Sequence, residues 1–247
     1  MDNRTLFSGK SQDYSFARPG YPAESAAFLR AKCRGERVAD IGAGTGIFTD
    51  VLLPFFQQVC AVEPNADMHE AFKDFLPQVV CLDGCGENTG LADNSVDLLT
   101  VAQAFHWLDE DKFKSEAMRI LRPGGMVAII WNTTVENAFS SARNEVCKKY
   151  CPRFSRGYAG KRTPQDGDRF LRQVYFSSVE FAEFDNPFYM DETVFAANMR
   201  SRSYALRPGE ENFEAFASEL RQVFAAFAVD GKVCESQKTQ IYLGRFS

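Results

Sequence analysis

Apolar and polar positions along residues 37–131 follow two alternating patterns. Short, almost continuously apolar runs occur at residues 37–41, 59–63, 78–82, 96–102 and 126–131, and stretches with helical spacing of apolar residues separate most of them. A strand that is apolar along its whole length is typical of a parallel sheet, because helices cover both faces of such a sheet. The pattern therefore predicts an α/β fold with a Rossmann-like, doubly wound sheet.

The pattern changes after Asn132. Helical spacing predicts helices near residues 135–150, 191–200 and 210–228 around a strand near 179–184, and the chain closes on a further strand. We interpret residues 35–132 as a cofactor-binding core, residues 1–34 and 133–236 as lid elements, and residues 237–247 as the last strand. The helices after Asn132 have too little core of their own to predict a second domain, so a single domain of residues 1–247 is expected, with the lid over the carboxyl edge of the sheet.

The junction of the first strand and first helix carries the string VADIGAGTG, in which Asp40 precedes Gly42, Gly44 and Gly46. Glycines at these positions allow a tight turn and let a ligand approach the backbone where a Cβ atom would collide. Glu63 ends the second strand, where an acidic side chain can accept hydrogen bonds from both ribose hydroxyls. A nucleoside cofactor is predicted, against the alternatives of a purely structural turn and a surface glutamate.

The glycine spacing also separates two classes of cofactor. A dinucleotide fingerprint has the pattern G-x-G-x-x-G, whereas here the third glycine arrives one residue early. Ile47 occupies the place where that fingerprint needs glycine or alanine. The spacing favours a methyltransferase over an NAD-dependent oxidoreductase on the same fold.

Five strings together carry a family resemblance: VADIGAGTG, AVEPNADM, GCGENTGLADNSVDLL, AQAFHWLD and RILRPGGMVAIIWN. Through most of residues 7–132 the sequence resembles the class I S-adenosylmethionine-dependent methyltransferases, and within them the small-molecule, trans-aconitate methyltransferase-like subfamily. The resemblance implies a sheet of seven strands, mostly parallel, with the last strand antiparallel. It also implies S-adenosylmethionine as the cofactor.

The resemblance assigns the cofactor contacts moiety by moiety. The implied contacts are Asp40, Gly42, Gly44, Gly46 and Gln103 at the methionine end, Glu63 at the ribose, and Pro64, Met68, Gly86 and Glu87 at the adenine. Family members often carry Asp in the segment that here reads Gly84-Cys85-Gly86-Glu87. Main-chain contacts are therefore expected there, rather than a contact from the Cys85 side chain.

The acceptor side is predicted from the N-terminal segment and from the residues after the fourth strand. The segment FSGKSQDYSFARPGYP resembles the N-terminal segment of the subfamily, which brings Tyr14, Arg18 and Tyr21 near the methyl group. The planar fork of Arg18 fits the carboxylate of the donor or of an acidic substrate, or else forms a structural salt bridge. His106, with Tyr14, is the candidate catalytic residue, since a histidine can act as a base at neutral pH.

Other residues are candidates for the wall of the acceptor pocket. His106 has the alternative role of a wall residue, and Trp107 is predicted to form either the floor of the pocket or part of the core. The subfamily resemblance suggests that Arg200 and Tyr204 line the pocket from the inserted lobe, where the arginine suits a carboxylate. The alternative is an ordinary solvated helix end.

The charge of the chain changes the choice of partner. The net charge of -5 disfavours a general nucleic-acid binder. Residues 148–172 nevertheless hold eight Lys or Arg against two Asp, a local net charge of +6. This segment is either a solvated surface or a field that draws in an anionic substrate.

Cysteine usage and hydropathy set further limits. The seven cysteines form no C-x-x-C pair and are accompanied by two histidines, so we expect structural thiols, no metal site and a reducing, cytoplasmic location. Met126–Trp131 is the longest strongly apolar run, which is too short to span a membrane, and the N-terminus has no basic and apolar leader.

These observations predict methyl transfer from S-adenosylmethionine to a small-molecule acceptor, with O-methylation of an acidic metabolite favoured. Direct SN2 transfer is expected, so the main contribution of the protein is alignment. A monomer or homodimer without membrane or nucleic-acid partner is predicted. The alternatives are an RNA or protein methyltransferase, the NAD-dependent oxidoreductase, and a methyltransferase-like binding protein without catalysis.

Overall fold

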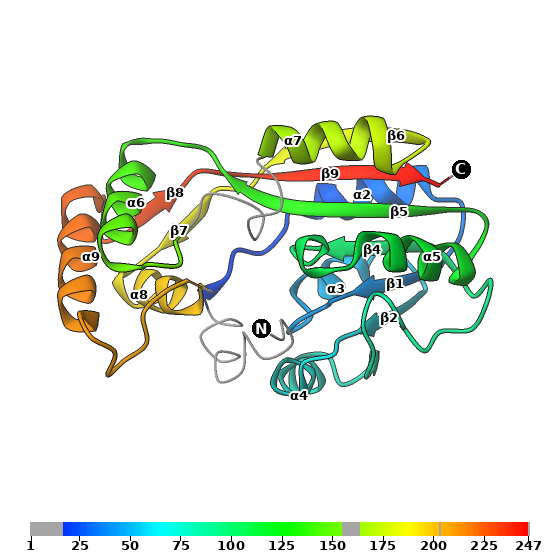
Figure 1. The fold of residues 1–247 in the computed structure, drawn as a ribbon, viewed down its shortest axis with the longest axis horizontal. Coiled ribbons are helices and arrows are strands. Elements are labelled where there is room, and N and C mark those ends of the chain that lie inside the picture. The colour runs from blue at the N-terminus through cyan, green and yellow to red at the C-terminus, as the bar shows by residue number, and fades with distance from the viewer. Residues whose placement is uncertain (1–16, 155–163, 203, 247) are drawn as a thin grey trace.

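A computed structural model describes residues 17–154, 164–202 and 204–246 (Figure 1). Its main feature is a seven-stranded sheet with the order β3-β2-β1-β4-β5-β9-β6. Strands β1 to β5 pair in parallel, and β9 runs antiparallel to both β5 and β6. The strands are β1 (Arg37–Ile41), β2 (Gln58–Val62), β3 (Val80–Leu82), β4 (Val96–Ala102), β5 (Leu121–Thr134), β6 (Ser178–Asp185) and β9 (Gln237–Arg245). The predicted doubly wound sheet with an antiparallel last strand is confirmed.

Helices cover both faces of this sheet. On one face, Leu29 and Phe48 pack against Leu98 and Ile130; on the other, helix and strand residues pack around Leu99 and Ile129. Neighbouring strand residues thus bury opposite faces, which explains the continuous apolar runs. The helices of the two layers and of the sheet edge are α2 (Ala23–Lys32), α3 (Ile47–Leu52), α4 (Ala66–Phe75), α5 (Glu110–Ile120) and α7 (Pro164–Phe170), joined by the 3-10 turn η2 (Phe105–Trp107) and the π turn η3 (Leu171–Tyr175).

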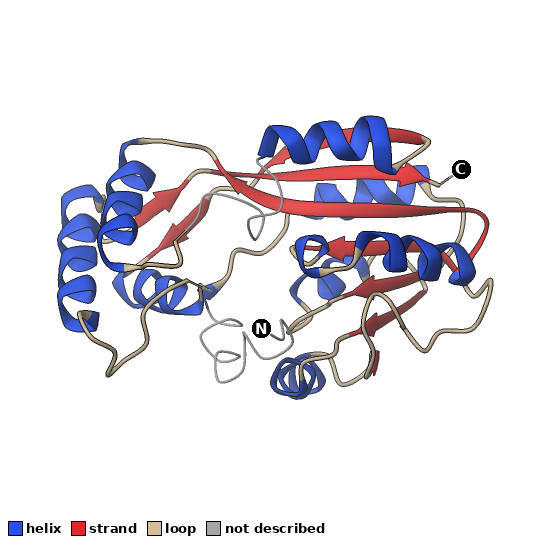
Figure 2. Cartoon of the chain, viewed as in Figure 1, coloured by secondary structure: helices blue, strands red, loops and turns tan. Residues whose placement is uncertain are grey.

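A second lobe lies beyond the carboxyl ends of the parallel strands (Figures 1 and 2). It consists of α6 (Ala138–Tyr150), α8 (Glu192–Ser201), α9 (Phe213–Phe227) and the two-stranded pair β7 (Phe188–Met190) and β8 (Val233–Glu235). The lobe has an apolar core of its own, built from residues such as Phe139, Phe195 and Phe216. This core is larger than the sequence led us to expect.

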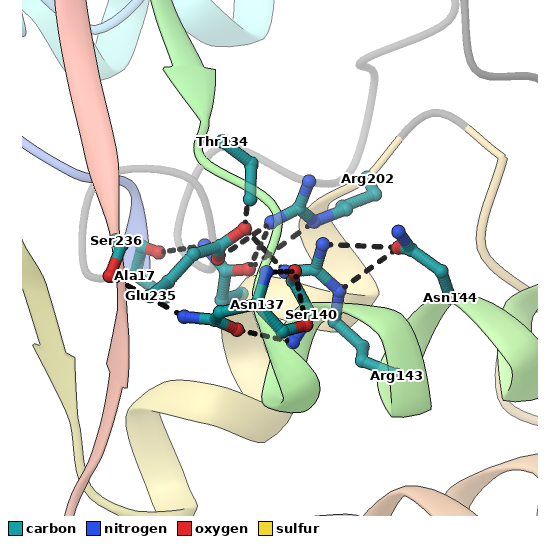
Figure 3. A network of polar contacts seen from close by, with 10 residues as sticks. Ala17, Thr134, Asn137, Ser140, Arg143, Asn144, Arg202, Glu235 and Ser236 are labelled. Carbon is teal, nitrogen blue, oxygen red and sulfur yellow. Dashed lines mark hydrogen bonds and ion pairs between the residues drawn. The ribbon is translucent and has the colours of Figure 1, made fainter.

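A buried ion network fixes the centre of this lobe (Figure 3). The fully buried Glu235 of β8 pairs through one carboxylate oxygen with Arg143 of α6 and through the other with Arg202 Nη2, at 3.2 Å. Burial by itself would raise the pKa of Glu235, but Arg202 and Arg143 outweigh it and lower that pKa to about 2. The network ties the β7-β8 pair to two of the three lobe helices.

Several helices and strands begin at other residues than predicted. Helices α6 and α8 begin after Asn137 and Asp191, whose side chains accept hydrogen bonds from the backbone N–H groups of Ser140 and Val194. Strand β5 starts at Leu121 rather than at residue 126. Val96 of β4 pairs with Leu121 and Leu98 pairs with Met126, so the register shifts and residues 122–125 of β5 form an irregular bulge. Within the described residues, no helix combines the length and apolar composition that crossing a bilayer requires.

Candidate functional site

The turn after β1 forms one wall of the site. Gly42, Gly44 and Gly46 all have positive φ angles, +66°, +59° and +91°. Residues other than glycine rarely adopt such angles. A Cβ atom on Gly42 would lie 2.7 Å from the Cβ of Ala104, whereas one on Gly44 would meet nothing within 4 Å. The predicted strand-to-helix turn is therefore present, and its Gly44 side is open.

Glu63 lies directly after β2, beside the glycine turn. One of its carboxylate oxygens accepts from the backbone N–H of Gly44 and the other from that of Asn65, both at 2.8 Å. Burial raises the pKa of Glu63, and the two backbone hydrogen bonds act in the opposite direction. Since each carboxylate oxygen can accept more than one hydrogen bond, Glu63 can still receive two further donors at this fixed position.

Asp40 lies below the turn and is 1% exposed. Its two oxygens accept from Thr49 Oγ1 and Thr100 Oγ1, each at 2.7 Å. Burial raises the pKa of Asp40 to about 6, and the two hydroxyl hydrogen bonds partly counteract the rise. The two threonines were missed from the sequence. Their polar side chains within an apolar strand and an apolar helix face were the signal available.

The glycine turn, Asp40 and Glu63 line a cavity of about 540 Å³, a volume typical of small-molecule sites. The predicted residues that line it are Arg18, Tyr21, Asp40, Gly42, Gly44, Glu63, Pro64, Met68, Gly86, Glu87, Gln103 and Trp107. Residues that were not predicted also line it, among them Ile47, Asn65, Cys85, Lys112 and Asn132. The cavity thus collects residues that are more than 100 positions apart in sequence.

Gln103 follows β4 with a φ angle of +55°, in the left-handed region that few residues with a side chain adopt. Its backbone N–H donates to Ile130 O at 2.9 Å, and its side-chain Nε2 donates to Asn132 O at 3.0 Å. Such a conformation has an energetic cost and persists where surrounding contacts hold it. These contacts fix Gln103 at the edge of the cavity.

Five predicted site residues are not placed among the lining residues. Gly46 caps α3 beneath the turn, and the 3-10 turn puts the His106 ring against Trp107, with ring centroids 4.6 Å apart. Arg200 lines a second cavity, of about 410 Å³, on α8 and α9, and Tyr204 packs on Phe154 in the lobe core. Arg200 and Tyr204 therefore lie apart from the residues that line the cavity at the glycine turn, and their contact with the acceptor stays a prediction. Tyr14 lies outside the described residues.

The described part of the basic segment is partly neutralised by local pairs. Lys148 and Lys149 pair with Glu145 and Glu219, and Arg172 pairs with Asp168. Among the described residues, all seven cysteines are free thiols and no cluster of metal-ligating side chains occurs. That the protein holds no metal ion stays an expectation.

Comparison with known proteins gives a sequence match to the methyltransferase domain family over residues 39–129. The chain is 43% identical to an uncharacterized methyltransferase of Mycobacterium tuberculosis over 123 residues, 50% of each chain. It is also 30% identical over 162 residues to a Saccharomyces cerevisiae protein described as "Probable S-adenosylmethionine-dependent methyltransferase". This match covers 62% of this chain and 55% of that protein. The chain spans about half the length of the curated relatives that it matches.

Solved structures share the fold over more of the chain. A chain from Anaeromyxobacter dehalogenans superposes with a TM-score of 0.65 at 24% identity, covering 92% of this chain and 97% of that one. A phosphoethanolamine N-methyltransferase of Haemonchus contortus, solved with S-adenosylhomocysteine, has a TM-score of 0.56 at 14% identity and covers 100% of this chain and 60% of that one. At these identities the likeness establishes the fold alone.

Proposed function

We propose that this chain, whose residues 39–129 match the methyltransferase domain, transfers a methyl group from S-adenosylmethionine to a small-molecule acceptor. The observation that carries the proposal is the cavity that the glycine turn and Glu63 line at the carboxyl ends of the parallel strands. Ligands of open α/β sheets bind at this edge of the sheet.

The residues of the cavity fit this cofactor. The open side of Gly44 leaves room for a ligand against the backbone, and Glu63 keeps acceptor positions for two ribose hydroxyls. Pro64 and Met68 offer apolar surface for a purine, and Asp40 can accept from an ammonium group. When bound, S-adenosylmethionine supplies a methyl group on a sulfonium, which is already activated for transfer.

Two observations favour a methyltransferase over an NAD-dependent oxidoreductase. Ile47 occupies the position at which a dinucleotide site needs glycine or alanine for close packing of the helix against the strand. The relatives that match the sequence carry methyltransferase names. The trans-aconitate methyltransferase-like subfamily remains part of the proposal.

The proposed acceptor is a small acid that is methylated on oxygen. Arg18 supplies a guanidinium to the cavity, while Tyr21 and Trp107 provide aromatic surface beside it. A carboxylate acceptor is already a nucleophile and requires no general base. This chemistry agrees with the position of His106 outside the cavity lining. The chain then contributes mainly orientation, which is worth up to about 7–11 kcal/mol in well-aligned reactions.

A small-molecule partner, a monomeric or homodimeric state and a cytoplasmic location are parts of the same proposal. The ion pairs of Lys148, Lys149 and Arg172 reduce the field available to nucleic acid. An RNA mobility assay at two salt concentrations therefore serves as a control, because a strong salt-dependent shift would favour RNA as the acceptor.

Calorimetric titration with S-adenosylhomocysteine and with NAD tests the cofactor. The wild-type chain should bind S-adenosylhomocysteine at micromolar concentration and should not bind NAD. Glu63→Ala should weaken the binding of S-adenosylhomocysteine by at least about tenfold, since hydrogen bonds to a charged group are worth about 1.5–3 kcal/mol. Absence of binding by the wild type would refute the proposal.

Transfer of a labelled methyl group to a panel of carboxylic acids, alcohols and amines tests the acceptor. Carboxylic acids should be labelled in preference, and Arg18→Ala should reduce that labelling by about tenfold or more. Labelling of amines alone would contradict the acidic O-methylation.

A further inference from the structure

Residues 17–21 cross from the second lobe to the sheet beside the cavity, and we call this segment the strap. In Figure 1 this blue segment runs from near α8 towards α2. Arg18, Pro19 and Tyr21 of the strap line the cavity, and the Tyr21 ring packs edge-on against Phe48, with centroids 4.8 Å apart. The strap therefore forms a wall of the cavity while it bridges the two halves of the molecule.

Two asparagines fasten the strap to the sheet. Gly20 O accepts hydrogen bonds from Asn186 Nδ2 at 2.8 Å and from Asn132 Nδ2 at 3.1 Å. Asn132 Oδ1 in turn accepts from Thr239 Oγ1 at 2.6 Å and from Asn186 Nδ2 at 3.1 Å. Since its oxygen faces two donors, the Asn132 amide has one orientation, in which its N–H2 group points at Gly20.

A third asparagine fastens the other end of the strap to the lobe. Asn198 of α8 donates to Ala17 O at 2.7 Å and is held by Arg202, which donates to its Oδ1 at 3.0 Å. Arg202 belongs to the ion network of Glu235. Figure 3 shows Ala17 beside this network. Arg18 Nη2 adds a hydrogen bond to Ser201 O at 3.0 Å.

Asn132 has a contact that the other two asparagines lack. Its main-chain oxygen accepts from Gln103 Nε2, and Gln103 is the residue of positive φ that also lines the cavity. Asn132 itself lines the cavity at the end of β5. One residue thus contacts both the strap and the residue that we expect at the methionine end of the cofactor.

We propose that Asn132 is a positioning residue that sets the strap, and with it Arg18 and Tyr21, against the cavity. It acts through Gly20 on one side and supports Gln103 on the other. The effect on ligand binding rests on the proposed function, whereas the effect on the order of the strap does not.

The test compares Asn132→Asp with the wild type and with Asn144→Asp. The aspartate has nearly the same shape and still accepts from Thr239, but it cannot donate to Gly20 O and repels it. Asn144→Asp makes the same change of charge on α6, where Asn144 Oδ1 accepts from Arg143 outside the cavity. The readouts are backbone ¹⁵N relaxation of Gly20 and Tyr21, calorimetric affinity for S-adenosylhomocysteine, and Tm.

In the wild type and in Asn144→Asp, the order parameters of Gly20 and Tyr21 should be near the rigid value of about 0.85. In Asn132→Asp they should fall below about 0.6, and affinity for S-adenosylhomocysteine should fall by about tenfold, with Tm within about 3 °C of the wild type. Should Asn132→Asp fail to fold, Asn186→Ala takes its place, because it removes one of the two donors to Gly20 O. In that variant the order parameters and the affinity should fall as well, but by smaller amounts.

Rigid strap amides in Asn132→Asp, or a mobile strap with undiminished affinity, would overturn the inference. If the wild type binds no S-adenosylhomocysteine, the proposed function fails, and the order parameters alone then decide whether Asn132 holds the strap.

Discussion

The ionisation of Asp40 affects the stability of the fold near neutral pH. Its carboxyl is buried with two hydroxyl partners, and its pKa rises from 3.8 to about 6. Between these two values the folded protein binds a proton that the unfolded chain has released. Stability therefore falls as the pH rises from about 4 to about 6, and it is then lower by about 3 kcal/mol, the free energy of a shift of this size.

Asp40→Asn should remove this pH dependence. The amide keeps the size of the side chain, and the Thr49 and Thr100 hydroxyls can rotate to suit it. Urea unfolding at several pH values from 4 to 7 should show the stability of the variant rising relative to the wild type by up to about 3 kcal/mol across that range. A constant difference between the two proteins would contradict a raised pKa at Asp40.

Some site residues could be predicted individually because their roles are set by local structure. Gly42 and Gly44 need positive φ angles in a turn between adjacent elements, and Glu63 follows its own strand by one residue. Asn132, by contrast, acquires its role from residues 20, 103, 186 and 239, which only the tertiary fold brings together. His106 lies next to Trp107, which lines the cavity, but is not itself a lining residue, and its catalytic role stays a prediction.

At the scale of elements, a buried ion network joins the short strand pair of the second lobe to its helices. Strands β7 and β8 have three residues each, too few to show an alternating pattern, and for this reason they could not be predicted. Glu235 at the end of β8 links that pair to α6 through Arg143 and to α8 through Arg202. The helices around it were predictable because their apolar spacing extends over several turns.

Glu235→Gln should destabilise the lobe strongly. The amide leaves Arg143 and Arg202 without their shared carboxylate, and removal of one partner of a buried ion pair costs about 3–5 kcal/mol. Because the pKa of Glu235 is lowered to about 2, its contribution is complete above about pH 4.5 and is lost as the pH falls towards 2.

Urea unfolding at pH 7 measures this loss, and repetition at pH 3 should show a smaller difference between the two proteins. Glu145→Gln, which removes an exposed partner of Lys148, is the matched control and should unfold with the wild type. Equal stability of Glu235→Gln and the wild type at pH 7 would show that the network contributes little.

At the scale of the whole molecule, the chain passes between the sheet and the lobe through very short connections. Residues 186–187 separate β6 from β7, and Ser236 alone separates β8 from β9. Strand β9 then runs back between β5 and β6, so the last strand in sequence occupies an internal place in the sheet. The hydrophobic pattern predicted this strand but could not give its neighbours, which depend on long-range pairing.

These connections lead us to expect that the sheet and the lobe unfold together. Ile241 of β9 is fully buried in the sheet, so Ile241→Ala should destabilise the protein by about 2–5 kcal/mol. If unfolding is cooperative, the most protected amides of α9 should also exchange faster, by the factor that corresponds to the same free energy, although α9 packs in the lobe core and Ile241 in the sheet core.

Native-state hydrogen exchange followed by mass spectrometry on peptides of α9 measures this coupling. Tyr189→Ala, which truncates an exposed side chain of β7, should leave both the exchange of α9 and that of the sheet near the wild-type rates. Faster exchange in the sheet with unchanged exchange in α9 would instead show that the lobe opens independently. In that case the strap and the two short connections would act as hinges between separate folding units.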